Sequence, residues 1–243
     1  MNIELIVAGI VIFLVSATLQ GLTGFGFSIL AVPLITLFIS PKTAVPILLI
    51  YSMLINIVVL YSARKEINLK KIWILLIAGI ASMPLGTRLL VIMNESLLKI
   101  FIGSMIFVFG ILLLIGFRKK FKNEKLAMLP VGFLSGILGG SISISGPPII
   151  LFLSNQDVDK QTFRGNLAAY FFILNCFTIP VYYYNGLLTN EVWNLSLTFL
   201  PGLLIGVFIG NLFSHKIKDD HFKKLTLILL IIMGILSFIS GLK

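Results

Sequence analysis

The chain has 243 residues, of which 58% are hydrophobic and 12% are charged, and its mean hydropathy is +1.08. Soluble domains carry about 25% charged residues, and a chain of this length could not bury so much apolar surface inside itself. The composition therefore excludes a soluble globular domain, a disordered chain and a disulfide scaffold. It predicts an all-α, polytopic membrane protein.

The formal net charge of +10 would suggest nucleic acid as a partner if the protein were soluble. In a membrane protein, lysine and arginine instead gather in cytoplasmic loops, so we expect no nucleic-acid partner. The single cysteine, Cys176, excludes an intrachain disulfide. The two histidines, His215 and His221, share one charged loop. We therefore predict no metal site and no cofactor.

Apolar stretches follow one another along the whole chain. Six of them are near the length of about 20 residues that a helix needs to cross a bilayer: 43–63, 70–91, 97–117, 166–184, 192–213 and 222–242. Two further stretches are interrupted by glycine-rich sequence: 3–39, broken at 21–26, and 127–154, broken at 139–148. The flanking pieces of the second stretch are expected to be too short to cross alone.

The two interrupted stretches are predicted to be helix–turn–helix hairpins with their tips inside the membrane. Non-helical backbone persists at membrane depth only where it is enclosed by protein or lines water. The first hairpin begins at the amino terminus, which lacks the basic region and cleavage site of a signal peptide. We therefore expect that segment to be retained.

The distribution of basic residues predicts how these stretches cross. If both hairpins enter and leave on the same face, loops 64–71, 118–125, 155–165 and 214–224 share a face and hold 15 of the 19 Lys and Arg residues. If each interrupted stretch crossed once, this bias would largely cancel. We therefore predict a multi-pass plasma-membrane protein with cytoplasmic basic loops and both termini outside. Re-entrant hairpins and two full crossings fit this count equally well.

The two halves of the chain resemble each other. Similar residues recur in the same order, at offsets that rise from 115 to 124: Pro33 and Pro148, Asn56 and Asn175, Trp73 and Trp193, and Gly86 and Gly210. This pattern predicts a first repeat at 1–117, a basic cytoplasmic linker at 118–126 and a second repeat at 127–243. Each repeat has one hairpin and three crossings, so the two should be inverted repeats, as in transporters whose site lies near the midplane.

Both hairpin tips are candidate anion-binding sites. The helix that leaves each tip begins inside the membrane, where its first N–H groups lack partners and its dipole end is positive. Residues 23–26 are predicted to open this helix at the first tip, and Ser145 to precede it at the second. The carbonyls of the entering helices favour cations, so helix ends alone leave the sign of the ligand open. The predicted substrate-binding residues are Thr23, Gly24, Phe25, Gly26, Asn56, Ser141, Ser143, Ser145, Gly146 and Asn175.

Other polar and aromatic residues have structural interpretations. Asn56 and Asn175 lie in apolar crossings, where a buried amide needs a partner, and either an interhelical bond or a place along the substrate path provides one. Arg88 and Arg164 lie near segment ends, where extension to an interface is the favoured interpretation. A binding role, of Arg164 with Asn166 and of Arg88 with Asn211, is the alternative. Isolated glycines such as Gly79, Gly132 and Gly202 are expected to allow close helix packing. The predicted interfacial anchors are Trp73, Trp193, Tyr182, Tyr183 and Tyr184.

The sequence also lacks the marks of other function classes. All nine acidic residues fall in or near predicted loops, so no carboxylate relay crosses the bilayer core. No Walker A pattern, HExxH motif or nucleophile elbow is present. We therefore predict no catalytic residues and no ATP-driven transport.

Three features together resemble the sulfite exporter TauE/SafE family of membrane permeases: the glycine-rich 21–26 followed by Pro33, its counterpart at 136–148, and the late 201–206. The resemblance implies transport of small sulfur-containing anions such as sulfite or organosulfonates. We predict a secondary transporter that works by alternating access. Its expected partners are a small anionic solute and the lipid bilayer, and a homodimer is the assembly that we consider. The alternatives are an anion channel of the same fold, a membrane anchor or assembly protein without a solute and, more distantly, a membrane enzyme.

Overall fold

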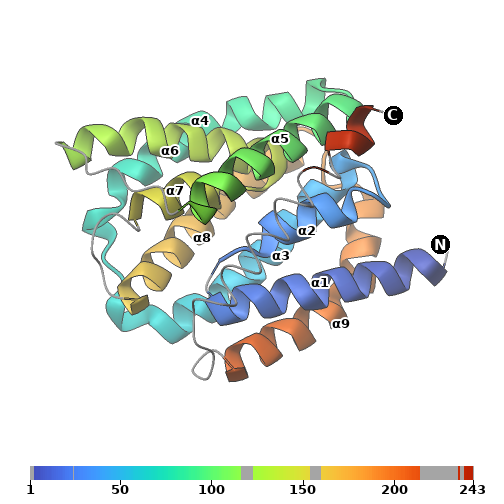
Figure 1. The fold of residues 1–243 in the computed structure, drawn as a ribbon, viewed down its shortest axis with the longest axis horizontal. Helices are drawn as coiled ribbons and strands as arrows, with labels where there is room; N and C mark the ends of the chain where they lie inside the picture. The colour runs from blue at the N-terminus through green and yellow to red at the C-terminus, as the bar shows by residue number, and fades with distance from the viewer. Residues whose placement is uncertain are drawn as a thin grey trace.

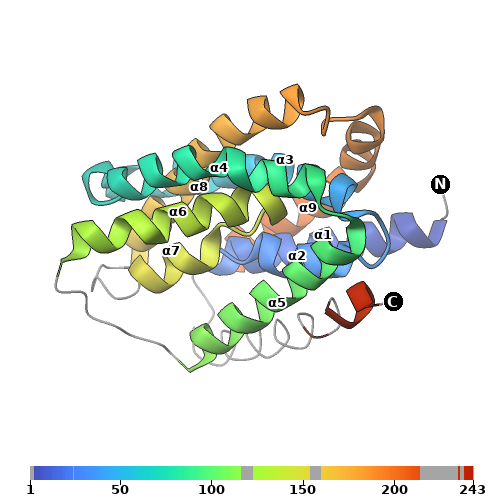
Figure 2. The ribbon, with the colours of Figure 1, turned by 90° about the horizontal axis from the view of Figure 1, so that it is seen from above.

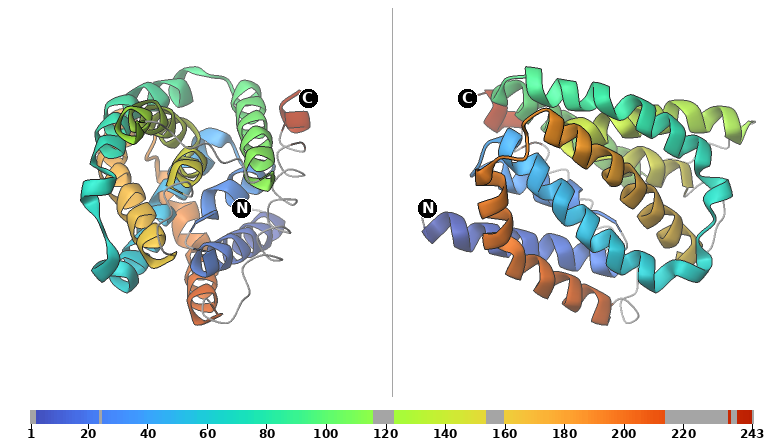
Figure 3. Two further views of the ribbon diagram at one scale, coloured as in Figure 1. Left: turned by 60° about the vertical axis from the view of Figure 1, so that its left-hand side comes forward. Right: turned by 180° about the vertical axis from the view of Figure 1, so that it is seen from behind.

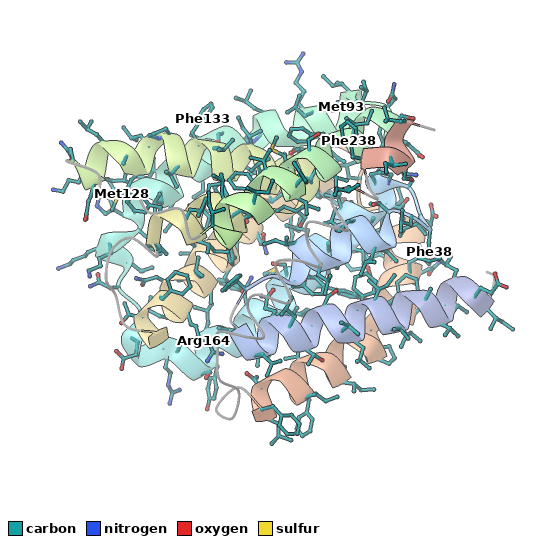
Figure 4. The ribbon with its side chains drawn as sticks, viewed as in Figure 1. Phe38, Met93, Met128, Phe133, Arg164 and Phe238 are labelled. Carbon is teal, nitrogen blue, oxygen red and sulfur yellow. The ribbon has the colours of Figure 1, made fainter. Side chains whose placement is uncertain are left out.

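The computed structural model describes residues 3–23, 25–115, 123–153, 160–213, 235 and 238–242. All regular structure within these ranges is helical, and seven of the helices are long and apolar enough to cross a membrane. Large apolar side chains such as Phe38 and Phe133 lie on the outside of the bundle (Figure 4), where lipid would cover them. The prediction of an all-α polytopic membrane protein is confirmed.

The first half of the chain contains α1 (Ile3–Thr23), α2 (Phe27–Ile35), α3 (Pro41–Ala63), the short turns η1 (Arg64–Glu66) and η2 (Leu69–Lys71), α4 (Trp73–Ile92) and α5 (Glu95–Leu114). The second half contains α6 (Glu124–Ile142), α7 (Gly146–Leu153), α8 (Lys160–Tyr184) and α9 (Asn190–Phe213). Five predicted crossings coincide with α3, α4, α5, α8 and α9. The sixth, 222–242, and the linker 118–126 lie largely outside the described residues.

Each interrupted stretch forms a long helix followed by a short one. α1 has 21 residues and α2 has 9, while α6 has 19 and α7 has 8. The expectation that both pieces of 127–154 are too short to cross is therefore wrong for α6, because the helix continues through Gly139, Gly140 and Ser141 to Ile142. Gly140 is tolerated within the helix because its lack of a side chain lets the backbone of α4 pack closely against it.

Two helix pairs form the longest packing contacts in the described structure. α1 lies along α9, and α4 lies along α6, on opposite sides of a centre where α3 packs against α8 (Figures 1 and 2). Glycines four residues apart line both contacts: Gly202, Gly206 and Gly210 on α9, and Gly132, Gly136 and Gly140 on α6. A Cβ at any of them would collide with backbone carbonyl oxygen of the facing helix. The packing role predicted for such glycines is confirmed for Gly79, Gly132 and Gly202.

The helices of the two hairpins start from opposite ends of the molecule. Both chain termini lie at one end, while η1, η2 and the beginning of α6 lie at the other (Figures 1 and 3). α1 therefore runs inward from one end and α6 from the other, so the two tips approach each other inside the bundle. Which end faces the cytoplasm stays a prediction.

Two residues expected at an interface are buried instead. Tyr182 is fully buried, and its hydroxyl donates to the carbonyl oxygen of Gly140 at 2.8 Å. Arg164 is only 5% exposed, because α8 begins at Lys160 rather than at 166 and places this side chain within its second turn (Figure 4). Both expectations are therefore wrong. The remaining expected interfacial residues are exposed: Arg88, Trp73, Trp193, Tyr183 and Tyr184.

Candidate functional site

A small cavity lies where the two hairpin tips meet α3 and α8. Its volume is about 30 Å³, and on the same measure about 10–15 Å³ is already enough to hold one water molecule. The residues that line it are Gln20, Phe25, Gly26, Ser28, Ile29, Ser52, Gly139, Ser143, Ile144, Ser145, Gly146, Phe171 and Asn175. Both halves of the chain therefore contribute to a single polar space.

The first tip is held by a side chain from the end of α1. Gln20 is 4% exposed, and its Oε1 accepts a hydrogen bond from the backbone N–H of Phe27 at 3.1 Å. This bond satisfies the first N–H of α2, which has no side-chain cap at Gly26. Gly26 adopts a left-handed φ of 100°, a conformation that residues with a Cβ rarely adopt. The following residues, Ser28 and Ile29, line the cavity at the start of α2.

The first tip therefore differs from the prediction in one respect. Thr23 is the last residue of α1, so residues 23–26 do not open the returning helix, which begins at Phe27. The predicted residues Phe25 and Gly26 line the cavity. The side chain of Thr23, and Gly24 as a whole, lie outside the described part of the chain.

The second tip is held by a chain of hydroxyl groups. Tyr170 donates to the Oγ of Ser135 at 3.0 Å, and Ser135 donates to the carbonyl oxygen of Ser145 at 2.6 Å. Ser143 ends α6 in a left-handed conformation with φ 57°, an unusual geometry for a residue other than glycine. α7 then begins at Gly146, directly after Ser145 as the sequence predicts. The cavity-lining members Ser143, Ser145 and Gly146 come together here.

One predicted residue of the second tip lies apart from the cavity. The hydroxyl of Ser141 donates to the carbonyl oxygen of Ile137, one turn earlier in α6, at 2.7 Å. Ser141 is fully buried and is not among the residues that line the cavity. Its place in a serine-rich run gave no indication of this, because neighbouring residues of a helix face different directions.

The two asparagines of the prediction converge on one serine. Asn56 and Asn175 are 0% and 6% exposed, and the Nδ2 of each donates to the Oγ of Ser52 at 3.2 Å. The Oδ1 of Asn56 accepts from the Nε2 of Gln20 at 3.4 Å. Asn56 thus forms an interhelical hydrogen bond, which was one of its two interpretations. It is not among the residues that line the cavity. Asn175 bonds α8 to α3 and also lines the cavity.

Three polar residues of the cavity were not predicted: Gln20, Ser28 and Ser52. Ser52 lies four residues before Asn56, and residues at this spacing share one face of a helix. The spacing from Asn56 could therefore have indicated Ser52 as a residue of the site. Gln20 directly precedes the glycine run of the first tip, which is a weaker signal.

The lining combines hydrogen-bonding groups with apolar surface. Its polar side chains are hydroxyls and amides, and none of the described lining residues carries a charge. The partially positive starts of α2 and α7 lie at the same place. Hydrogen bonds are stronger in such a low-dielectric setting than in water. The cavity can therefore hold a small polar guest through neutral donors.

Comparison with known families gives one finding. A family model described as Sulfite exporter TauE/SafE matches residues 8–237. Comparisons with curated proteins and with solved structures give no significant match. The matched range includes both hairpin tips and every residue that lines the cavity.

Proposed function

This chain belongs to the sulfite exporter TauE/SafE family of membrane proteins, and on that premise we propose that it is a permease for a small anion. The family is one of transporters rather than enzymes. The substrate we propose is a sulfur-containing oxyanion such as sulfite or an organosulfonate, carried across the plasma membrane. The observation that carries this proposal is the single cavity to which both hairpin tips contribute hydrogen-bonding groups.

The groups around the cavity favour an anion over a cation. The N–H of Phe27 is already bonded to Gln20, but Ser28 and Ile29 line the cavity at the same helix start. Backbone N–H groups at a helix start, together with the positive dipole end, bind anions in many proteins. The hydroxyls of Ser143 and Ser145 add donors at the second tip.

We propose alternating access between two inverted repeats as the mechanism. The packing of α1 on α9 has its counterpart in the packing of α6 on α4, with each hairpin helix resting on a helix of the other half. The buried tyrosines Tyr51 and Tyr170 stand 119 residues apart, as do Asn56 and Asn175. An oxyanion of sulfur is larger than one water molecule, and we propose that the tips separate to admit it. Rocking of one helix pair against the other would provide that movement.

The test of the function uses purified protein and proteoliposomes. Thermal unfolding is measured with sulfite, sulfate, thiosulfate, alkyl sulfonates and carboxylates, with chloride at equal ionic strength as the control. An anion that binds the folded state stabilises it by about 2.7 kcal/mol at 100 times its Kd. The same anion should show saturable flux into proteoliposomes.

The other outcomes assign other functions. Linear, non-saturating flux would indicate an anion channel. Stabilisation by cations alone would contradict the choice of an anion. If no solute stabilises the protein or crosses the membrane, an anchor or assembly role replaces transport.

Membrane sidedness gives a separate prediction. In a Cys176→Ser background, single cysteines are introduced at Lys70, in η2, and at Asn94, between α4 and α5, both of which are exposed. A membrane-impermeant thiol reagent added to intact cells should label position 94 and not position 70, because the basic loop is expected in the cytoplasm. Lysed cells, in which both positions should react, are the control. The reverse labelling pattern would contradict the predicted orientation.

A further inference from the structure

We propose that the hydroxyl of Ser52 donates a hydrogen bond to the transported anion, and that Asn56 and Asn175 are positioning residues that direct its proton into the cavity. This inference rests on the proposed function and names one donor of the same site. It follows from which groups donate and which accept around Ser52.

A backbone N–H group, that of Phe27, fixes the direction of the hydrogen bonds that lead through Gln20 and Asn56 to Ser52. The N–H of Phe27 can only donate, so the atom of Gln20 that faces it must be the acceptor Oε1. The other amide atom of Gln20, Nε2, then donates to Asn56, which must present its Oδ1. Asn56 is left with Nδ2 toward Ser52, and this nitrogen can only donate.

Ser52 therefore accepts from Asn56, and it accepts a second hydrogen bond from the Nδ2 of Asn175. A hydroxyl has one donor and two acceptor positions. With both acceptor positions occupied, Ser52 can interact with a further group only by donating its proton. Neither of its hydrogen bonds in the described structure uses that proton, and the side chain lines the cavity.

A donor that cannot also accept discriminates between guests. It favours oxyanions, whose oxygens accept hydrogen bonds, and it offers no acceptor to a cationic guest that presents only donors. The equivalent position in the second half, 119 residues later, is Phe171, which also lines the cavity. The second half of the chain therefore has no counterpart to this hydroxyl at that position.

The decisive comparison is between Ser52→Thr and Ser52→Val. These two side chains have nearly the same shape and stiffness, and they differ by a hydroxyl in place of a methyl group. Flux of sulfite and methanesulfonate into proteoliposomes is measured for both. We expect the KM of Ser52→Thr to stay within a few-fold of the parent protein. The KM of Ser52→Val should rise about tenfold or more, because a hydrogen bond to a charged group is lost.

The matched control is Ser104→Ala on α5. Its hydroxyl donates to the carbonyl oxygen of Ile100 within the same helix, and it does not line the cavity. Its KM should not change. The positioning role is tested by a double-mutant cycle with Asn56→Ala, which should raise the KM more in the parent protein than in Ser52→Val. Any effect that remains in Ser52→Val reports the other contact of Asn56, with Gln20. Additive effects would contradict that role.

The outcomes separate this inference from the proposed function. If Ser52→Val keeps the KM of Ser52→Thr while the parent protein transports anions, the assignment of Ser52 is wrong and the function stands. If the parent protein neither binds nor carries any anion, the function itself fails. If both β-branched variants misfold, Ser52→Ala and Ser52→Cys provide the same comparison with smaller side chains, and an unchanged KM in Ser52→Ala would overturn the assignment.

Discussion

Replacing Gly136 by valine is expected to prevent α4 and α6 from packing as observed. The melting temperature should fall by about 10 °C or more, or no folded protein should be obtained. A Cβ at this position would collide with the carbonyl oxygen of Gly79 and with the Oγ of Ser82. Overpacking typically costs about 1–3 kcal/mol. Here the obstacle is partly backbone, which cannot rotate away, so we expect a cost at the upper end of that range or above it.

The same substitution should also disrupt a hydrogen bond between α4 and α6. Ser82 donates to the carbonyl oxygen of Phe133 at 2.7 Å across this contact. Thermal unfolding and size-exclusion chromatography of the purified protein measure the effect. The control is Ala81→Val, which adds bulk to an exposed position of α4. An equal loss of stability in that variant would show that the close approach at Gly136 is not the cause.

Filling the cavity from either tip is expected to abolish transport while leaving the protein folded. Ser28→Trp extends from α2 and Ser145→Trp from the second tip, and both positions line the cavity and are partly exposed. A bulky indole at either position would fill the space between the tips, so either variant should block the substrate path. Flux should fall to the level of protein-free liposomes.

The control for this experiment is Leu197→Trp, at a position of α9 that is 67% exposed on the outside of the bundle. It should transport normally. Because the two tryptophans approach from different halves of the chain, both must block flux if the path runs between the tips. Normal flux in either one, in a folded protein, would place the substrate path elsewhere.

The positions of the chain breaks could be predicted from the sequence, but their detailed geometry could not. Glycine- and proline-rich runs weaken a helix locally, and this indicated both tips. The first tip lies later than predicted, because Gln20 from α1 provides the acceptor that lets α2 begin at Phe27. That acceptor is seven residues away along the chain, and only the folded hairpin brings it close.

The residues matched between the two halves of the sequence were likewise only partly informative about the structure. Asn56 and Asn175 were paired as counterparts in the two repeats, and the finding that both donate to the Oγ of Ser52 was not predicted. Pro33 and Pro148 hold different places, since Pro33 is the seventh residue of α2 and Pro148 is the third of α7. A match between two prolines in apolar sequence does not show that they hold equivalent positions in their helices, because proline disturbs a helix wherever it occurs.

The sequence by itself determined that this protein is a bundle of apolar helices with two glycine-rich broken hairpins, because lipid admits little other than helices in such a chain. Tertiary structure alone decided which side of each helix faces the protein. These helices are apolar on all sides, so periodicity gives no inner face. Packing against a neighbouring helix buried Tyr182 and Arg164, turned Ser141 away from the cavity and placed Gln20 and Ser52 within it.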